Sequence, residues 1–323
     1  MKLIITFSKL LVIIFLFGIT SLTTAQNDSW TFKTPMPTGR GFTSGAVVEG
    51  KIYVIGGFPT HYSATGANEM YDPSTDSWTK MADMPEGRCE HATCAYNGKI
   101  YVFGGLHPNP YSNAKNNVYV YDPQSNTWTQ KANMPYESAI CGVAVVNDTI
   151  YLIGGMLNFA AVPVSRLMAY DPLTDTWSEK APMPIPRGWF SASVVDGKIY
   201  AIGGTNEDFH RVCYKLVEVY DPKTNTWSGK SDMPSGRTGL GTCSLNGKIY
   251  AVGGFCNPET LSECLMYDPI SDRWTKITSL QTKRHTCFTG SVGDKIYTIA
   301  GSYPQGSEPI ILNSVEEYDL SKE

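Results

Sequence analysis

The chain has 323 residues, a formal net charge of −4 and no cluster of Lys or Arg side chains, which excludes the basic surface of a nucleic-acid-binding protein. Its 30 glycines, 19 tyrosines and 7 tryptophans, with only 17% charged residues, favour many short strands joined by tight turns. The length fits either two ordinary domains or one large repeat fold.

Residues 1–25 are predicted to form a cleavable export signal. Lys2 and Lys9 precede an apolar run of 13 residues, Leu10 to Leu22, and Thr23-Thr24-Ala25 supplies the small residues of a cleavage site. A membrane anchor is the alternative, but the run is shorter than the roughly 20 residues that a spanning helix needs. We therefore expect a secreted or periplasmic protein that has no membrane span after cleavage.

Three markers recur in register after residue 29. The first is a Gly pair (Ala-Gly in the sixth repeat), at intervals of 48, 50, 49, 50 and 47 residues, with first members Gly56, Gly104, Gly154, Gly203, Gly253 and Ala300. The second is a Tyr-Asp pair, with tyrosines Tyr71, Tyr121, Tyr170, Tyr220, Tyr267 and Tyr318. The third is a tryptophan seven residues after five of those tyrosines, namely Trp78, Trp128, Trp177, Trp227 and Trp274. Such self-similarity is typical of a repeat architecture.

Each repeat contains four strand signals, A to D in chain order. In the first repeat, strand A (44–48) is small and apolar, and strand B (51–55) is a continuous apolar run, as expected for a strand buried on both faces. Glu49-Gly50 between them favours the positive φ angles of a tight hairpin. Strand C ends at Tyr-Asp and strand D carries the Trp. Small residues dominate strand A, which predicts that it lines a narrow central axis.

The sixth repeat ends at Glu323 without its Trp strand. Trp30 precedes Met36-Pro37 and Arg40 just as Trp78 precedes Met84-Pro85 and Arg88. We therefore predict that the strand around Trp30 completes the last blade and closes the ring, which leaves no open sheet edge.

These markers, a Gly pair, then Tyr-Asp-Pro, then Trp, resemble the kelch repeat. The resemblance covers Trp30 to Asp319 and implies an all-β, six-bladed propeller with four-stranded antiparallel blades. The expected organisation is a signal peptide at 1–25 and one propeller domain at 26–323. The expected repeats are about 40–86, 88–136, 138–186, 187–236, 237–282, and 284–323 completed by 26–37.

The repeated residues are interpreted first as scaffold. Six of the seven tryptophans, the tyrosines and the glycines belong to this class. An arginine stands 16 residues before the Gly pair in five repeats, and Ser138 takes its place in the third. We expect a structural arginine that leads into strand A, with a binding role as the second possibility. The five are Arg40, Arg88, Arg187, Arg237 and Arg284.

The residues that do not repeat point to one face of the ring. The A–B and C–D turns are short and uniform, whereas the B–C connections vary in length and content, at 58–68, 106–117, 156–165, 205–215, 255–263 and 302–313. Variable loops on a rigid scaffold commonly carry function. The kelch resemblance also implies this face, where the B–C and D–A connections meet; we call it the loop face.

Aromatic and histidine side chains gather in the same connections. Trp189 is the only tryptophan outside the repeat, and all five histidines map to this face. Loops collect such residues by default; the alternative is a shallow site where rings stack on a sugar, with polar groups at its edges. The candidate ligand-binding residues are Trp189, Phe190, Phe159, Phe209, His210, Arg211, His91, Glu90, Tyr303 and His285.

Catalysis and cofactors have weaker support. Glu90, Glu207 and Asp208 with His91 or His285 could serve acid–base chemistry, and Arg211 could neutralise an anionic ligand, but no fixed spacing enforces it. No Gly-x-Ser-x-Gly, His-Glu-x-x-His, Walker or dinucleotide motif is present. Nothing has metal-ligand spacing, so neither a metal nor another cofactor is expected, and catalytic residues stay unassigned.

An exported chain can keep disulfides. Cys256 and Cys264 flank the short loop 257–263 and form the candidate pair. Cys94, Cys141, Cys243 and Cys287 fall in apolar strand patterns, which predicts buried thiols.

Two functions follow from this pattern. The first is an extracytoplasmic binding module that holds a carbohydrate or a protein on the loop face. The second is a sugar-processing enzyme resembling the exported kelch-type sialic-acid mutarotases. A copper enzyme of the galactose-oxidase kind and a ubiquitin-ligase adaptor both need further domains and fit less well. The oligomeric state stays open.

Overall fold

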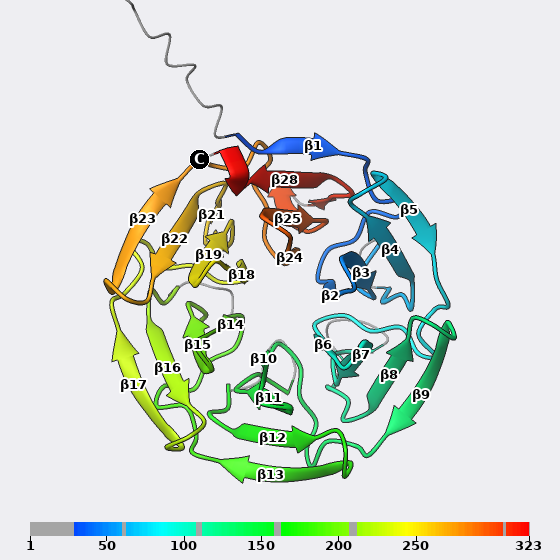
Figure 1. Cartoon of the computed structure of the whole chain (residues 1–323), viewed down its shortest axis with the longest axis vertical. Coiled ribbons are helices and arrows are strands. Elements are labelled where there is room, and N and C mark those ends of the chain that lie inside the picture. The colour runs from blue at the N-terminus through cyan, green and yellow to red at the C-terminus, as the bar shows by residue number, and fades with distance from the viewer. Residues whose placement is uncertain are drawn as a thin grey trace, which may run out of the picture.

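The computed structural model describes residues 29–59, 63–107, 112–157, 163–206, 212–305 and 308–322. Six four-stranded antiparallel sheets stand like blades around a central axis (Figure 1). The innermost strands are β2, β6, β10, β14, β18 and β24, and the outermost are β5, β9, β13, β17, β23 and β1. The predicted all-β, six-bladed propeller is therefore confirmed. The export signal and its cleavage site lie outside the described residues.

The blades follow one another in chain order. Blade 1 comprises β2 (Ser44–Val48), β3 (Lys51–Ile55), β4 (Asn68–Asp72) and β5 (Ser77–Lys80). Blade 2 comprises β6 (Ala92–Tyr96), β7 (Lys99–Phe103), β8 (Val118–Asp122) and β9 (Thr127–Lys131). Blade 3 comprises β10 (Gly142–Val146), β11 (Thr149–Ile153), β12 (Leu167–Asp171) and β13 (Thr176–Lys180).

The other three blades keep the same order of strands from the axis outward. Blade 4 comprises β14 (Ser191–Val195), β15 (Lys198–Ile202), β16 (Val217–Asp221) and β17 (Thr226–Lys230). Blade 5 comprises β18 (Gly241–Leu245), β19 (Lys248–Val252), β22 (Cys264–Asp268) and β23 (Arg273–Ile277). Blade 6 comprises β24 (Phe288–Val292), β25 (Lys295–Ile299), β28 (Val315–Asp319) and β1 (Thr31–Lys33).

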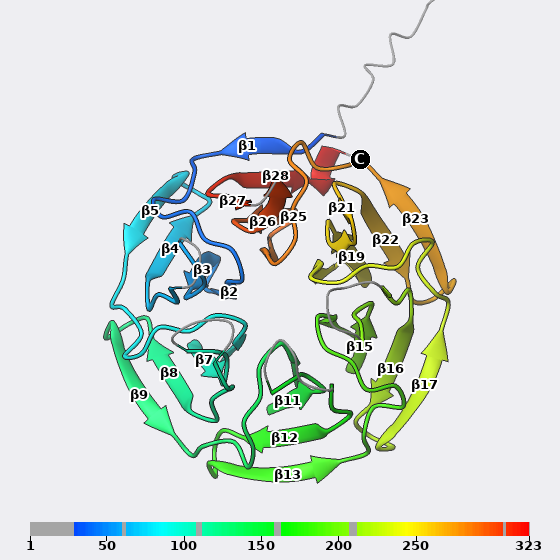
Figure 2. The ribbon, with the colours of Figure 1, turned by 180° about the vertical axis from the view of Figure 1, so that it is seen from behind.

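Two small hairpins and one short helical turn complete the described structure. The hairpins are β20 (Phe255–Cys256) with β21 (Glu259–Thr260), and β26 (Ser302–Gln305) with β27 (Glu308–Ile311), and they project from the B–C connections (Figure 2). A 3-10 turn, Leu320–Lys322, follows β28. No helix in the described part of the chain is long and apolar enough to cross a membrane.

The N-terminal strand closes the ring as predicted. Strand β1 pairs antiparallel with β28, with Thr31 opposite Glu317 and Lys33 opposite Val315. The indole of Trp30 is buried and donates to the carbonyl of Thr278 in blade 5 at 2.9 Å. The closing blade is therefore assembled from both ends of the chain.

A ring of hydrogen bonds joins neighbouring blades near the axis. In each blade the second residue of the Gly pair donates its N–H to the carbonyl of the repeated arginine of the next blade, or of Ser138 where that replaces it. The six bonds run from Gly57 N to Arg88 O at 2.7 Å through to Gly301 N to Arg40 O at 2.9 Å. A Cβ on Gly56 would lie only 2.5 Å from the Arg88 carbonyl oxygen. This close approach explains the repeated glycines.

The outer wall, which we define as strands C and D with their turn, repeats a second set of contacts. In blade 4, the Tyr220 hydroxyl donates to Asn225 Oδ1 at 2.7 Å, and that oxygen also accepts the N–H of Ala181 in blade 3. The Trp227 indole donates to the Ala181 carbonyl at 2.9 Å. Blades 1, 2, 3 and 5 make the same contacts with Asp76, Asn126, Asp175 and Asp272.

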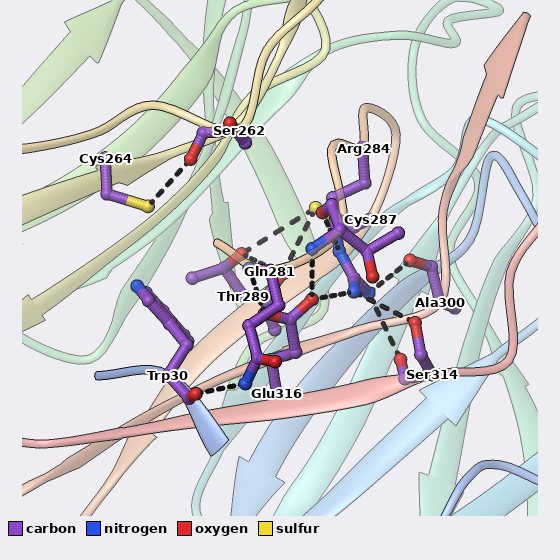
Figure 3. Close-up of polar contacts among 12 residues, drawn as sticks. Trp30, Ser262, Cys264, Gln281, Arg284, Cys287, Thr289, Ala300, Ser314 and Glu316 are labelled. Carbon is purple, nitrogen blue, oxygen red and sulfur yellow. Dashed lines mark hydrogen bonds and ion pairs between the residues drawn. The ribbon is translucent and has the colours of Figure 1, made fainter. Parts of the chain in front are cut away.

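The repeated arginines are scaffold. Each is almost fully buried and binds a carboxylate, in the pairs Arg40–Glu69, Arg88–Glu86, Arg187–Glu218, Arg237–Glu263 and Arg284–Glu316. Figure 3 shows Glu316 between Arg284, at 2.5 Å, and the N–H of Gln281, at 2.8 Å. Blade 3 lacks both partners, because Ser138 replaces the arginine and Met168 stands where blade 4 has Glu218.

Candidate functional site

An axial ring of six equivalent residues surrounds the axis at the loop face, just before each strand A. Its members are Phe42, Glu90, Ile140, Trp189, Gly239 and Thr286, and all have φ between 53° and 60°. Backbone hydrogen bonds pass from blade to blade around it, from Glu90 N to Phe42 O at 3.1 Å onward to Thr286 N to Gly239 O at 2.7 Å. The backbone is the same in all six blades, and the side chains all differ.

The left-handed conformation is unusual for this set of residues. Ile140 and Thr286 are β-branched, and β-branched residues rarely adopt positive φ. Strain of this kind, about 1–3 kcal/mol per residue, persists only where surrounding contacts fix the backbone, and it clusters at functional sites. The hydrogen bonds of the axial ring supply that restraint.

Two adjoining cavities lie inside the axial ring, and together we call them the axial pocket. The outer cavity has a volume of about 150 Å³ and is lined by axial-ring side chains, including Glu90, Ile140 and Trp189. The inner cavity, about 180 Å³, runs between the innermost strands. Thr43, His91, Cys141 and Phe190 are among the residues that border both, so the two cavities are neighbours.

Aromatic rings cover the mouth of this pocket. Phe42 and Trp189 come from blades 1 and 4, on opposite sides of the propeller, and their ring centroids lie 6.0 Å apart in an edge-on contact. Phe42 also lies 6.0 Å from the ring of His285. Trp189 is only 6% exposed and packs among Phe58, Leu106 and Met156. In this conformation Trp189 is therefore a cover over the pocket rather than an exposed stacking platform.

Blade 2 places unpartnered polar groups at the pocket. Glu90 Oε1, both ring nitrogens of His91 and Thr93 Oγ1 are buried and make no hydrogen bond within the described part of the chain. His91 lies just before β6 and Thr93 is the second residue of that strand, and both line the inner cavity. Buried polar groups in native proteins nearly always have partners, so these three positions call for a ligand or water.

Burial shifts both titratable groups of this cluster toward their neutral forms. Burial of the carboxyl raises the pKa of Glu90 well above its ordinary value. Burial, together with the positive charges of Arg88 and Arg40, lowers the pKa of His91 to about 3. Burial therefore favours the protonated form of Glu90, and His91 is uncharged near neutral pH, so the pocket offers both hydrogen-bond donors and acceptors.

The candidate residues separate into three groups. Trp189, Phe190, Glu90 and His91 meet at the axial pocket. His285 contacts Phe42 and Phe255 beside the mouth, whereas Tyr303 lies on the β26 hairpin under the ammonium of Lys283 at 5.3 Å. Phe159, Phe209, His210 and Arg211, with Glu207 and Asp208, lie outside the described residues. Sequence reasoning missed Thr93 and Thr286, whose only signal was their place relative to the repeated arginine.

The predicted Cys256–Cys264 disulfide is wrong. Cys256 pairs with Cys213, which is 43 residues earlier, and their Cα atoms are 5.8 Å apart. Cys264 instead begins β22, where it is buried as a free thiol. The pairing joins the B–C connections of blades 4 and 5, which the ring brings side by side, so nearness in sequence misled. Cys94, Cys243 and Cys287 are buried free thiols as predicted, and Cys141 is a partly buried one.

No group of three or more His, Cys, Asp or Glu side chains within the described ranges is arranged to hold a metal ion. The chemistry that this site offers comes from hydroxyl, imidazole, carboxyl and aromatic groups. These groups suit hydrogen bonding to a polar ligand under an aromatic cover.

Comparisons with known proteins agree with this architecture. A solved structure titled "Structure of YjhT" superposes with a TM-score of 0.75 at 19% identity, over 87% of this chain and 95% of that one. The Kelch-like protein terF of Aspergillus terreus is 43% identical over 51 residues, which are 15% of this chain and 11% of that protein. The family model of the KLHDC2/KLHL20/DRC7 Kelch-repeats domain matches residues 14–204 and 179–301. With six blades built on the same markers, this chain belongs to the kelch-repeat family.

Proposed function

We propose that this protein is an exported binding protein that holds a small carbohydrate in the axial pocket of its loop face. The observation that carries the proposal is the unpartnered set of Glu90, His91 and Thr93 beside a cavity. Sugar hydroxyls both donate and accept hydrogen bonds, so they can satisfy a carboxyl, a neutral imidazole and a hydroxyl together. The Phe42 and Trp189 rings at the mouth supply the apolar surface that sugar C–H faces pack on.

Export is part of this proposal. It is supported by the predicted signal at residues 1–25 and by the Cys213–Cys256 disulfide, because disulfides persist in oxidising compartments and are rare in the cytosol. Mass spectrometry of the protein from culture medium or periplasm, with Gln26 as the N-terminal residue, would support it. Retention of residues 1–25 in the cytoplasm would contradict it.

The first test is thermal unfolding against a panel of mono- and oligosaccharides. A ligand at 100 times its Kd stabilises the folded protein by about 2.7 kcal/mol, which appears as a rise in Tm.

For any sugar that binds, Trp189→Phe should weaken the affinity, because the smaller ring covers less of the mouth. The matched control is Trp227→Phe on the outer wall, which should lower the Tm of the free protein and leave Kd unchanged. An unchanged Kd in Trp189→Phe would contradict this placement, and silence across the panel would favour a protein ligand on the loop face.

A second candidate function is sugar processing, as in the exported kelch-type sialic-acid mutarotases that the sequence resembles. It is favoured by one observation: a carboxyl whose pKa is raised by burial and an uncharged imidazole stand at neighbouring positions of one pocket. Ring opening of a sugar needs a proton delivered to the ring oxygen and another removed from the anomeric hydroxyl. Anomer-resolved NMR tests this function. Interconversion should exceed the buffer rate and fall at least tenfold in Glu90→Gln, and a rate equal to buffer would reject catalysis.

A further inference from the structure

Hydroxyl groups line the inner cavity of the axial pocket. Thr43, Ser44, Thr93, Ser191, Thr242 and Thr289 contribute them from five of the six blades. Some are already engaged with protein: Thr43 donates to the carbonyl of Ile55 at 2.8 Å, and Ser191 and Thr242 lie 2.8 Å apart. Thr93 Oγ1 is buried without a partner. The lining is therefore polar and retains hydrogen-bonding capacity for a ligand.

Basic side chains are missing from this lining. Among the described residues that border either cavity, none is Lys or Arg. The nearby arginines are held by groups of the scaffold: Arg40 donates to Glu69 Oε2 at 2.9 Å and to the carbonyl of Ala67 at 2.8 Å. Arg88 donates to Glu86 and, at 3.2 Å, to Asn117 Oδ1. Each of these guanidinium groups faces a carboxylate, and neither borders a cavity of the axial pocket.

We infer that the axial pocket selects an uncharged, polyhydroxylated ligand of about monosaccharide size, discriminates against the acidic form of the same sugar, and uses Thr93 as a specificity-determining residue. This inference rests on the proposed carbohydrate-binding function. A carboxylate that enters the pocket loses its hydration, and no cation of the described lining replaces it. Acidic sugars such as sialic acid are therefore poor ligands for this pocket.

Titration calorimetry with matched pairs of sugars tests the inference. The pairs are glucose and glucuronate, galactose and galacturonate, and mannose and mannuronate, with N-acetylneuraminate as a further acidic probe. The neutral member of at least one pair should bind at least tenfold more tightly than its uronate. A uronate or N-acetylneuraminate that binds as tightly as any neutral sugar overturns the selectivity while the carbohydrate function stands. Absence of binding by every sugar overturns both.

Two variants locate the selectivity in the pocket. Thr93→Val keeps the shape of the side chain and removes its hydroxyl, so the neutral sugar should bind at least fivefold more weakly. Thr79→Val, on the exposed outer strand β5, is the matched control and should leave Kd unchanged. Ser44→Lys places an ammonium at a residue that borders both cavities and should bring the uronate to within threefold of its neutral partner. An unchanged neutral-to-uronate ratio in folded Ser44→Lys, with Kd also unchanged in Thr93→Val, overturns the inference.

Discussion

At the outer wall, five blades make the same contacts with the same residue types, whereas the axial ring carries six different side chains on one backbone conformation. Each outer-wall residue must bridge to the neighbouring blade, so any change there breaks a seam of the ring. In the axial ring the backbone makes the blade-to-blade hydrogen bonds, so those bonds place no demand on the side chains. The comparison teaches that the repeat keeps a residue type where the side chain joins two blades. It varies the residue type where the backbone makes the hydrogen bond between blades.

The largest expected loss of stability comes from breaking one of the buried arginine–carboxylate pairs. Glu218→Met should destabilise the protein by about 3–5 kcal/mol, because it leaves the buried guanidinium of Arg187 without its carboxylate. The double variant Arg187→Ser with Glu218→Met copies blade 3, which has Ser138 and Met168, and should recover part of that loss. Urea unfolding measures both. A double variant less stable than Glu218→Met alone would show that blade 3 tolerates the exchange for reasons of its own.

The Cys213–Cys256 disulfide joins two connections of the variable face, so its loss should act on the loop face and spare the outer wall. Cys213→Ser with Cys256→Ser should cost about 2–4 kcal/mol. Cys264→Ser is the control and should leave the disulfide intact. Peptide mapping without reduction should link Cys213 to Cys256, and a link from Cys256 to another cysteine would contradict the structure.

A single hydroxyl on the outer wall should matter less. Tyr220→Phe removes the bond to Asn225 Oδ1, which still accepts the N–H of Ala181, so we expect a loss of about 1 kcal/mol. The same change at Tyr121, which donates to Asn126 Oδ1 at 2.7 Å, should cost a similar amount. Unfolding curves that differ by more than about 1 kcal/mol between the two variants would break the equivalence of the blades.

At the axial ring, Glu90 should make the stability of the protein depend on pH. Below pH 4.5 Glu90 is protonated in both the folded and the unfolded chain, and above it the unfolded carboxyl ionises while the folded one keeps its proton. The wild type should therefore lose stability relative to Glu90→Gln as pH rises from 4 to 8. His91 acts in the opposite direction between about 6.5 and 3, but it is present in both proteins and cancels. A difference that is constant from pH 4 to pH 8 would contradict the burial of this carboxyl.

The sequence was sufficient for the fold because the markers report contacts that every blade must make. The spacing of the Tyr, Trp and Gly-pair markers locates the strands, the blades and the closing strand at Trp30. It does so because each marker makes the same contact at the boundary between two blades. The site was only partly predictable. Trp189 and Glu90 stood out as exceptions to the repeat, but Thr93 looked like any small residue of strand A. Its lack of a partner depends on what β2 and the axis present to it, which spacing along the chain does not encode.

The cysteine pairing failed for a related reason. Cys256 and Cys264 are close in sequence, but Cys256 lies in the β20–β21 hairpin and Cys264 begins β22. The ring instead places Cys213 of the blade 4 connection beside Cys256 of the blade 5 connection. Contacts between successive blades join residues about one repeat apart, so a period near 50 is a better guide to pairing in this fold than short loops are.

Closure of the ring by β1 sets an order for synthesis and folding. Among the described strands, β1 pairs with β28 alone, and the side chain of Gln281 donates to the carbonyl of Trp30. Because synthesis starts at the amino terminus, β1 is made first and stays unpaired until β28 has been made. The ring therefore stays open through most of synthesis and closes only when β28, the partner of β1, has been made.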